Sequence, residues 1–289
     1  MTRRALRVYI LGTGRLGLGL ALALRSANVP VVGLWNRSAA RRRRARRPWG
    51  GAIDGPDFGE AIARANLVLV CVSDDALASV AQALRQSGHL ARNTVVAHCS
   101  GALAASELGR LPHVLRGSLH PLVACATARV AARELPGAAY AVEGDAGAVA
   151  QLHDVVRALR GRAIPVSAKG KARYHAAAVM SSSLVLALVS MATQEAQAAG
   201  MHHAERELLR LTRGAIEAAQ TLGCVSALTG PLVRGDVATL TRHMQALGPR
   251  ARAAYTLLST AAFTPLLAGK LTPAQRAQIV RLLEKKTDG

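Results

Sequence analysis

The stretch "YILGTGRLGLGLALALRSANVP", residues 9–30, decides how the first part of the chain folds. Arg3 and Arg4 precede this apolar run, an arrangement that also occurs in twin-arginine export signals. A leader peptide has an uninterrupted apolar centre and a small-residue cleavage site, but Arg15 interrupts the centre here and another strand-like run follows Arg25. We therefore expect this stretch to be part of a folded domain and not a leader.

Three glycines in the same stretch, Gly12, Gly14 and Gly17, have the GxGxxG spacing of a dinucleotide-binding turn. Residues 6–11 are apolar and β-rich, as in a buried parallel strand, and the residues after the turn favour a helix whose N-terminus would face phosphates. The first glycine permits the sharp bend, the second lets the backbone approach a pyrophosphate, and the third lets helix and strand pack closely. The predicted phosphate-binding residues are Gly12, Thr13, Gly14, Arg15, Leu16 and Gly17.

The end of the second predicted strand, residues 29–36, indicates which dinucleotide is bound. NAD-binding folds usually have Asp or Glu at this point for the ribose hydroxyls. This chain has Asn36, Arg37 and Ser38 instead, and the next acidic residue is Asp54. A carboxylate would repel a 2′-phosphate, whereas Arg37 can bind one with two N–H groups and Ser38 can donate to it. We therefore predict NADP(H) as the cofactor and add Asn36, Arg37 and Ser38 to its site.

The composition limits the class of protein. The chain has 289 residues, of which 51% are hydrophobic and only 3% aromatic, so its core is built from Ala, Leu and Val, as in helical and doubly wound proteins. No window of about 18 uninterrupted apolar residues occurs, so we expect no membrane span. The four cysteines have neither CxxC nor zinc spacing, which predicts thiols in a reducing, cytoplasmic compartment and no metal site.

The formal charge of +20 comes mainly from arginine, and six arginines crowd the segment "RRRRARR", residues 41–47. A charge of this size is compatible with a nucleic-acid partner. However, the Ala and Arg excess is spread over the whole chain, so we attribute the charge to composition and do not expect nucleic-acid binding. Most of the arginine segment is predicted to be a solvated helix face. Residues 41–44 are also expected to add positive electrostatic potential at the adenosine end of the cofactor.

Strand and helix signals alternate as far as residue 166, which predicts an α/β fold with a doubly wound, mostly parallel sheet. In such sheets ligands bind beyond the carboxyl ends of the strands. Ser73, Ser100 and His120 follow predicted strands and are expected on the nicotinamide side, and Val72 and Ser73 are assigned to the cofactor site. Strand signals stop near Lys169, which predicts an NADP-binding domain over residues 1–167 and a helical substrate and dimerisation domain over residues 168–289.

A polar cluster begins the helical region, where a single long helix is predicted over residues 171–199. Lys171 and His175 are four residues apart and share one helix face; Ser182 lies two turns further along, with Ser183 beside it. Lys and His beside a dinucleotide can donate protons to a reduced carbonyl or imine. The alternative is an ordinary polar helix start, with a surface lysine and a histidine that caps or packs.

A second polar segment, "LTGPLVRGD" at residues 228–236, interrupts the helical region. Arg234 could hold an anionic group of the substrate. Asp236 is more simply explained as the cap of the next helix, with Arg234 as its ion-pair partner.

Six motifs then support a family resemblance. In order, they are "GTGRLG", "VSDDAL", "HCSGAL", "GSLHPL", "KARYHAAAVMSSS" and "LTGPLVRGD". Together they resemble a bacterial family of Rossmann-like proteins with a C-terminal domain of unknown function (DUF2520), similar to that of 6-phosphogluconate dehydrogenase. The resemblance covers nearly the whole chain. More distantly, the chain is similar to pyrroline-5-carboxylate reductase and the β-hydroxyacid dehydrogenases.

The resemblance implies site residues and an assembly. In β-hydroxyacid dehydrogenases a serine after a strand, and a helical lysine with a polar residue four later, bind and protonate the substrate; these positions match Ser100, Lys171 and His175. The family members nearest to this chain usually have Asn where this chain has Ser183. Relatives with this architecture are dimers whose helical domains interlock, which implies a homodimer here.

These observations predict an NADP(H)-dependent oxidoreductase that transfers a hydride to or from a small carbonyl or imine carbon. The expected catalytic residues are Lys171, His175, Ser100 and His120. The expected substrate-binding residues are Gly101, Ser182, Ser183 and Arg234. The alternative is a regulatory protein that binds NADP without catalysis, which the Ser183 difference and the positive charge favour.

Overall fold

The computed structural model describes residues 5–263 and 271–284, so Arg3 and Arg4 lie outside the described residues. The chain divides into two compact units, residues 1–182 and 183–289. The predicted domain limit after residue 167 follows the last strand, whereas the first compact unit also includes the helix α6 (Lys171–Met180).

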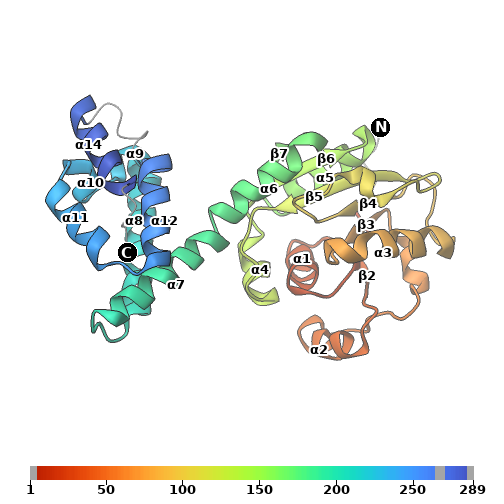
Figure 1. The fold of residues 1–289 in the computed structure, drawn as a ribbon. Coiled ribbons are helices and arrows are strands. Elements are labelled where there is room, and N and C mark those ends of the chain that lie inside the picture. Colours follow the sequence, from red (N-terminus) through yellow and green to blue (C-terminus); the bar gives the residue numbers. More distant parts are fainter. Residues whose placement is uncertain (1–4, 264–270, 285–289) are drawn as a thin grey trace. The chain divides into compact units, whose positions relative to one another are not determined.

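A seven-stranded sheet forms the centre of the first unit within the described residues, in the order β2-β1-β3-β4-β5-β6-β7 (Figure 1). The strands are β1 (Val8–Leu11), β2 (Val31–Trp35), β3 (Leu67–Val70), β4 (Val95–His98), β5 (Leu115–Pro121), β6 (Ala139–Gly144) and β7 (Arg162–Pro165). Every pairing is parallel except that of β5 with β6, which is antiparallel. The predicted α/β fold with a mostly parallel sheet is confirmed.

Helices cover both faces of this sheet. The helices of the first unit are α1 (Arg15–Ser26), α2 (Ala39–Trp49), α3 (Asp74–Ser87), α4 (Ala128–Glu134), α5 (Ala146–Ala158) and α6, with the short 3-10 turns η1 (Glu60–Arg64), η2 (Ala105–Leu108) and η3 (Ala168–Gly170). Helices α1 and α4 pack side by side, and residues of α1, α4 and α5 share one hydrophobic core. Residues of α3, η1 and η2 belong to the core on the opposite face.

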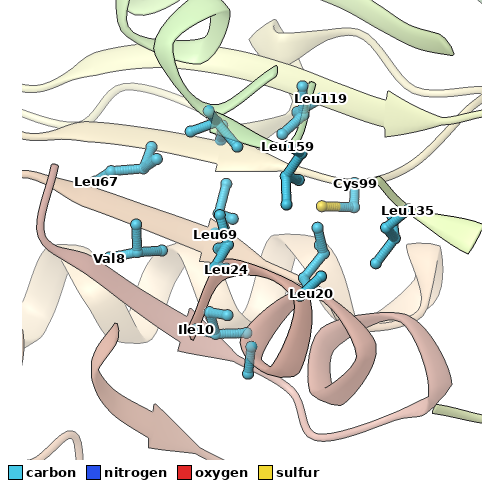
Figure 2. Close-up of a cluster of buried hydrophobic side chains, with 14 of the residues drawn as sticks. Val8, Ile10, Leu20, Leu24, Leu67, Leu69, Cys99, Leu119, Leu135 and Leu159 are labelled. Carbon is cyan, nitrogen blue, oxygen red and sulfur yellow. The ribbon is translucent and has the colours of Figure 1, made fainter. Parts of the chain in front are cut away.

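Alternating strand residues build these two cores. Val8 and Ile10 of β1, together with Leu67 and Leu69 of β3, belong to the core shown in Figure 2. The residues between them, such as Tyr9, belong to the other core. Because side chains alternate across a strand and both faces are covered, the strands are continuous apolar runs, as the sequence suggested. Burying each leucine contributes about 1.5–3 kcal/mol.

The glycine turn joins β1 to α1. Gly12 has φ of +100°, and a Cβ on Gly17 would lie 1.9 Å from the Gly12 carbonyl oxygen, so neither position accepts a side chain. A Cβ on Gly14 would meet no atom within 4 Å. Gly14 is the N-cap of α1 and makes no side-chain cap bond, which leaves that cap position without a protein side chain.

The second unit is helical in its described residues, around a small core of Leu232, Leu240, Met244, Leu271, Ile279 and Leu283. Its helices are α7 (Ser183–Ala198), α8 (Ala204–Leu222), α9 (Cys224–Ala227), α10 (Pro231–Arg234), α11 (Val237–Ala246), α12 (Pro249–Leu257) and α14 (Pro273–Glu284), with a π-helical turn at Leu258–Phe263. A proline opens α14, where its missing N–H costs nothing.

The single helix predicted over residues 171–199 is wrong, because the α-helix is interrupted at Ser181 and Ser182. The Oγ atoms of both serines donate to the Ala178 carbonyl oxygen, at 3.1 and 2.6 Å. The Ser182 amide donates to the Val179 carbonyl, a tighter 3-10 pattern. Serine hydroxyls that bond nearby carbonyls compete with the helical ladder, which explains the interruption.

One stretch of the described chain, Ala168–Ala198, is long and apolar enough to cross a membrane by length and composition alone. Its mean hydropathy is 1.8, and only 11% of the window is buried. A single stretch of this kind is weak support for a membrane span, because the core helix of a soluble protein or a signal sequence passes the same test.

Candidate active site

Three elements of the first unit bring Ser100, His120, Lys171 and His175 together, as the sequence predicted. Ser100 follows β4, His120 is near the end of β5, and the other two lie on α6. The Lys171 Nζ atom donates to the Ser118 Oγ at 2.5 Å and to the Ser100 carbonyl oxygen at 3.0 Å. These bonds fix the start of α6 to the carboxyl ends of β4 and β5.

Lys171 is almost completely buried, with 1% of its surface exposed. Burial lowers its pKa, while the nearby Glu143, Cys99 and Asp74 act in the opposite direction. The charge of Lys171 also acts on His120, whose pKa it helps to lower.

His120 lies between two aromatic neighbours of α6. Its Nδ1 is hydrogen-bonded to the Tyr174 hydroxyl at 2.9 Å, and its ring meets the His175 ring edge to face at 5.3 Å. Burial, followed by the effects of His175 and Lys171, lowers the pKa of His120 to about 4. Burial raises the pKa of Tyr174 to about 12. At neutral pH the pair is therefore a neutral imidazole and a protonated phenol.

His175 and His120 converge over Gly101. A Cβ on Gly101 would lie 2.3 Å from His175 Nδ1 and 2.9 Å from His120 Nε2, so any other residue would displace a ring. The Nδ1 of His175 is buried and has no hydrogen-bond partner among the described residues. A buried polar nitrogen without a partner is costly unless a ligand satisfies it. The two rings therefore offer a contact point for a polar group of a ligand.

The Ser100 hydroxyl is fully engaged within the protein. It donates to Asp74 Oδ2 at 3.0 Å and accepts from the amides of Ala102 and Leu103 at 3.2 and 3.1 Å. Beside it, His98 accepts from the Ser100 amide through Nδ1, which leaves its Nε2 to donate to the Ala104 carbonyl at 2.9 Å. Ser100 thus shapes the loop that carries Gly101.

Several members of this cluster were not predicted from the sequence. They are Asp74, His98, Ser118 and Tyr174. All four occur inside motifs used for the family resemblance, so the motifs carried a signal that the predicted elements alone did not.

The predicted ribose site has an internal support. The Asn36 Nδ2 donates to Thr13 Oγ1 at 2.9 Å, and its Oδ1 accepts from the Ser38 amide at 2.9 Å. Asn36 is buried, so it links the end of β2 to the glycine turn. The Ser38 Oγ caps α2 by accepting from the Arg41 amide at 3.4 Å.

The arginines after β2 differ in exposure and in their hydrogen bonds. Arg37 and Arg41 are exposed, whereas the partly buried Arg42 donates through one guanidinium nitrogen to the carbonyl oxygens of Asn36, at 2.8 Å, and Arg37, at 3.0 Å. Arg42 therefore fixes the backbone of residues 36 and 37, while the side chain of Arg37 stays exposed.

The remaining predicted cofactor residues surround the glycine turn. Thr13 is buried, Arg15 is exposed and Leu16 is partly buried in the first turn of α1. The Val72 Cγ1 would lie 3.3 Å from a Cβ on Gly12, and Ser73 is the exposed N-cap of α3. These residues follow β1 and β3, which are adjacent strands.

The other predicted substrate residues, Ser182, Ser183 and Arg234, lie outside this cluster in the chain. Ser182 is exposed in the interruption after α6, Ser183 begins α7, and Arg234 is exposed at the end of α10. The capping role of Asp236 is confirmed, because its carboxylate accepts from the Thr239 amide at 3.0 Å and from its hydroxyl at 2.7 Å. These hydrogen bonds, followed by the charges of Arg234 and Arg242, lower the pKa of Asp236.

Two family models match the chain. The model of a Rossmann-like domain matches residues 1–123, and the model of DUF2520, a domain of unknown function, matches residues 138–262. No curated protein matches the chain.

Solved structures share the fold over most of the chain. A protein from Bacteroides fragilis, provisionally assigned as an NADP oxidoreductase, is 20% identical, with 89% of this chain and 97% of that one covered and a TM-score of 0.72. A reductive aminase from Aspergillus terreus in complex with NADPH and ethyl-5-oxohexanoate is 19% identical, with 96% and 99% covered and a TM-score of 0.62. A pyrroline-5-carboxylate reductase from Coxiella burnetii is 15% identical, with 98% and 100% covered and a TM-score of 0.60.

Proposed function

We propose that this chain, which belongs to the proteins that join a Rossmann-like domain to a DUF2520 domain, is an NADP(H)-dependent oxidoreductase acting on a small carbonyl or imine compound. One observation carries the proposal. The glycine turn and the cluster around His120 both lie at the carboxyl ends of strands of a single sheet, within one compact unit. In open parallel sheets this edge is where a dinucleotide and its substrate meet.

The first unit suits the cofactor's diphosphate. The space over Gly14 is free of protein atoms, and the N-terminus of α1 has no side-chain cap. Amides at a helix N-terminus bind anions well. Gly12, Thr13, Gly14, Arg15, Leu16, Gly17, Val72 and Ser73 would line this part of the site. The fold shared with a reductive aminase bound to NADPH supports the same assignment.

Arg37 and Ser38 are proposed to select NADP(H) over NAD(H). Arg37 is exposed where an NAD-binding chain has a carboxylate, and its backbone is fixed by Arg42. A guanidinium fixed at this point can bind a 2′-phosphate with paired hydrogen bonds. Asn36 contributes by holding the loop against Thr13.

When bound, the reduced nicotinamide supplies a hydride to a carbonyl or imine carbon. The chain must then supply a proton to the oxygen or nitrogen of that group. We assign this task to His175, while the neutral His120 donates a hydrogen bond that orients the acceptor group; ring nitrogens of both residues converge over Gly101. Lys171 is proposed to polarise the acceptor group, and the carbonyl oxygen of Ser100 accepts a hydrogen bond from its amine. Proton donors placed in this way typically contribute about 10²–10⁴-fold in rate.

Tyr174 is proposed as a positioning residue for His120. Its hydroxyl stays protonated at neutral pH and lies 2.9 Å from Nδ1 of a neutral imidazole. If the hydroxyl donates to Nδ1, the imidazole proton resides on Nε2, which is the nitrogen nearest Gly101. The tautomer that the tyrosine selects is therefore the one that presents a donor to the substrate.

Arg234 is proposed to bind an anionic group of the substrate, with Ser182 and Ser183 as further polar contacts. Arg234 is exposed, and a guanidinium matches a carboxylate well.

We also propose a cytoplasmic homodimer formed through the helical unit. Leu184, Leu186, Leu211 and Ile216 are between 50% and 68% exposed, although they are large and apolar. Exposed apolar surface of this kind marks a protein interface. Light scattering at micromolar concentration is expected to give twice the mass of one chain.

The deciding experiment is calorimetry with NADPH and NADH, followed by NADPH oxidation across a panel of keto acids and cyclic imines. Binding of NADPH and its oxidation by at least one compound are expected. The absence of binding by either nucleotide would contradict the proposal. Tight NADPH binding without oxidation would favour the second candidate, a regulatory protein, which the Ser183 difference supports.

A further inference from the structure

Two thiols lie directly beneath the glycine turn. Cys71 follows β3 and Cys99 follows β4, and the last residues of these neighbouring strands, Val70 and His98, are paired in register. The two Sγ atoms are 3.5 Å apart. Cys99 is buried in the core shown in Figure 2, while Cys71 is partly exposed.

Cys71 supports the turn mechanically. A Cβ on Gly12 would lie 2.4 Å from the Cys71 carbonyl oxygen, and a Cβ on Gly17 would lie 2.9 Å from the Cys71 Cβ. The Cys71 amide also donates to the Leu11 carbonyl at 2.7 Å. Because packed backbones leave no slack, a displacement of Cys71 is transmitted to both glycines.

We propose that Cys71 and Cys99 are a modification site: when they react with a low-molecular-weight disulfide, they form a reversible disulfide with each other. This Cys71–Cys99 bond weakens NADP(H) binding. The coupling to the nucleotide rests on the proposed function, but formation of the disulfide does not. A disulfide requires an S–S distance of about 2.05 Å, so the sulfurs must approach by about 1.5 Å. We assign part of this movement to Cys71, whose carbonyl oxygen and Cβ lie against Gly12 and Gly17.

The reaction balances as two thiol–disulfide exchanges. The Cys71 thiolate attacks one sulfur of the reagent, breaks its S–S bond and releases one small thiol. The Cys99 thiolate then attacks the Cys71 sulfur of the mixed disulfide and releases the second small thiol. The protein loses two electrons and two protons, and the reagent gains them. Cys71 reacts first because it is the more exposed of the two.

The environment of the pair makes the reaction dependent on pH. The hydrogen bond with Cys99, followed by burial and by the charges of Cys99 and Cys125, raises the pKa of Cys71 well above that of an ordinary thiol. Arg15 acts on the nearby Cys125 in the opposite direction, although burial still raises the pKa of Cys125. Only the thiolate attacks, so the rate is expected to rise about tenfold per pH unit between about pH 7 and 9.

The first test uses oxidised glutathione on the reduced full-length protein. Intact mass is expected to fall by two hydrogens, peptide mapping is expected to link Cys71 to Cys99, and dithiothreitol is expected to reverse the change. Cys71→Ser and Cys99→Ser are expected to abolish the link, whereas the matched control Cys224→Ser, at an exposed cysteine of the second unit, is expected to retain it. A Cys99–Cys125 link, or glutathione on Cys224 alone, would overturn the assignment. The wild-type map needs no variant, so it remains decisive if a variant folds poorly.

The second test measures the coupling by calorimetry with NADPH on the reduced and the disulfide-linked protein. A weakening of about tenfold is expected, within the usual range of such couplings. By linkage, saturating NADPH must then make the disulfide about tenfold harder to form, which corresponds to about 30 mV in its reduction potential. Equal affinities of the two forms would overturn the coupling. Failure of the reduced protein itself to bind NADPH would instead contradict the proposed function and leave the mapped disulfide standing.

Discussion

The glycine turn and the cluster around His120 occupy the same sheet edge but depend on opposite properties. The turn requires that side chains be absent, since a Cβ at Gly12 or Gly17 would meet backbone atoms. The cluster requires particular side chains: the histidine nitrogens converge over Gly101, Tyr174 holds His120, and Ser118 accepts a hydrogen bond from Lys171. Added side-chain atoms are therefore expected to damage the glycine turn. The loss of a single polar atom is expected to damage the cluster around His120.

The largest effect is expected for Gly17→Ala. The new Cβ would lie 1.9 Å from the Gly12 carbonyl oxygen, a backbone atom that cannot move aside alone. Overpacking of this kind is expected to cost about 3 kcal/mol or more of unfolding free energy and to abolish NADPH binding. Urea denaturation and calorimetry measure the two effects.

Gly14→Ala is the matched control for this prediction. Nothing lies within 4 Å of its new Cβ, so stability is expected to remain while NADPH affinity falls. A loss of stability equal to that of Gly17→Ala would show that the glycines are needed for the fold and not for the ligand.

The next effect tests the cluster. Lys171→Ala removes the buried amine that bonds Ser118 and Ser100. Hydride transfer is expected to slow by about 10²–10⁴-fold while the NADPH dissociation constant stays within about twofold. Single-turnover kinetics with a substrate from the panel measures the rate, and wild-type speed would remove Lys171 from the mechanism.

Arg37→Ala probes cofactor choice at the outer end of the turn. The loss of a charged hydrogen-bonding pair is expected to raise the NADPH dissociation constant about 10- to 100-fold and to leave that of NADH nearly unchanged. Competitive titration with the two nucleotides distinguishes the outcomes, and equal changes for both would contradict the 2′-phosphate assignment.

The smallest effect is expected for Tyr174→Phe, which keeps the ring and removes the hydroxyl. The rate is expected to fall about tenfold, and nitrogen NMR of the histidine rings is expected to show His120 losing its single tautomer.

In the wild-type protein, His120 is expected to titrate near pH 4 instead of near 6.5, because burial disfavours its charged form. The unfolded chain then binds more protons between these values, so stability is expected to decrease as pH falls from about 6.5 to 4. For the Tyr174→Phe variant, an unchanged His120 tautomer would contradict the positioning role of Tyr174.

Local patterns predicted much of this molecule. Apolar runs located the strands, and the spacing of Gly12, Gly14 and Gly17 located the turn, because both follow from short-range backbone geometry. The helix α8 begins after the break at Gly200 and ends directly before Gly223, two glycines that local sequence already marks as helix ends.

Features that depend on how elements meet were not predictable. The contact between Tyr174 and His120 depends on the rotation of α6 over β5, and the hydrogen bond from Ser100 to Asp74 depends on the spacing of β3 and β4. Likewise, the interruption at Ser182 depends on which of two local hydrogen-bond patterns the hydroxyl adopts. Cys71 and Cys99 are 28 positions apart in the chain, and only strand register brings them into contact.

The bond network of Arg42 bears on any effort to reduce the positive charge of this protein for handling or crystallisation. The neighbouring Arg43, Arg44, Arg46 and Arg47 are exposed and are the natural positions for neutral replacements. Arg42 differs from them, because its guanidinium fastens the carbonyl groups of residues 36 and 37. A surface redesign that replaces every arginine of this segment would therefore loosen a loop, whereas one that spares Arg42 would leave both hydrogen bonds in place.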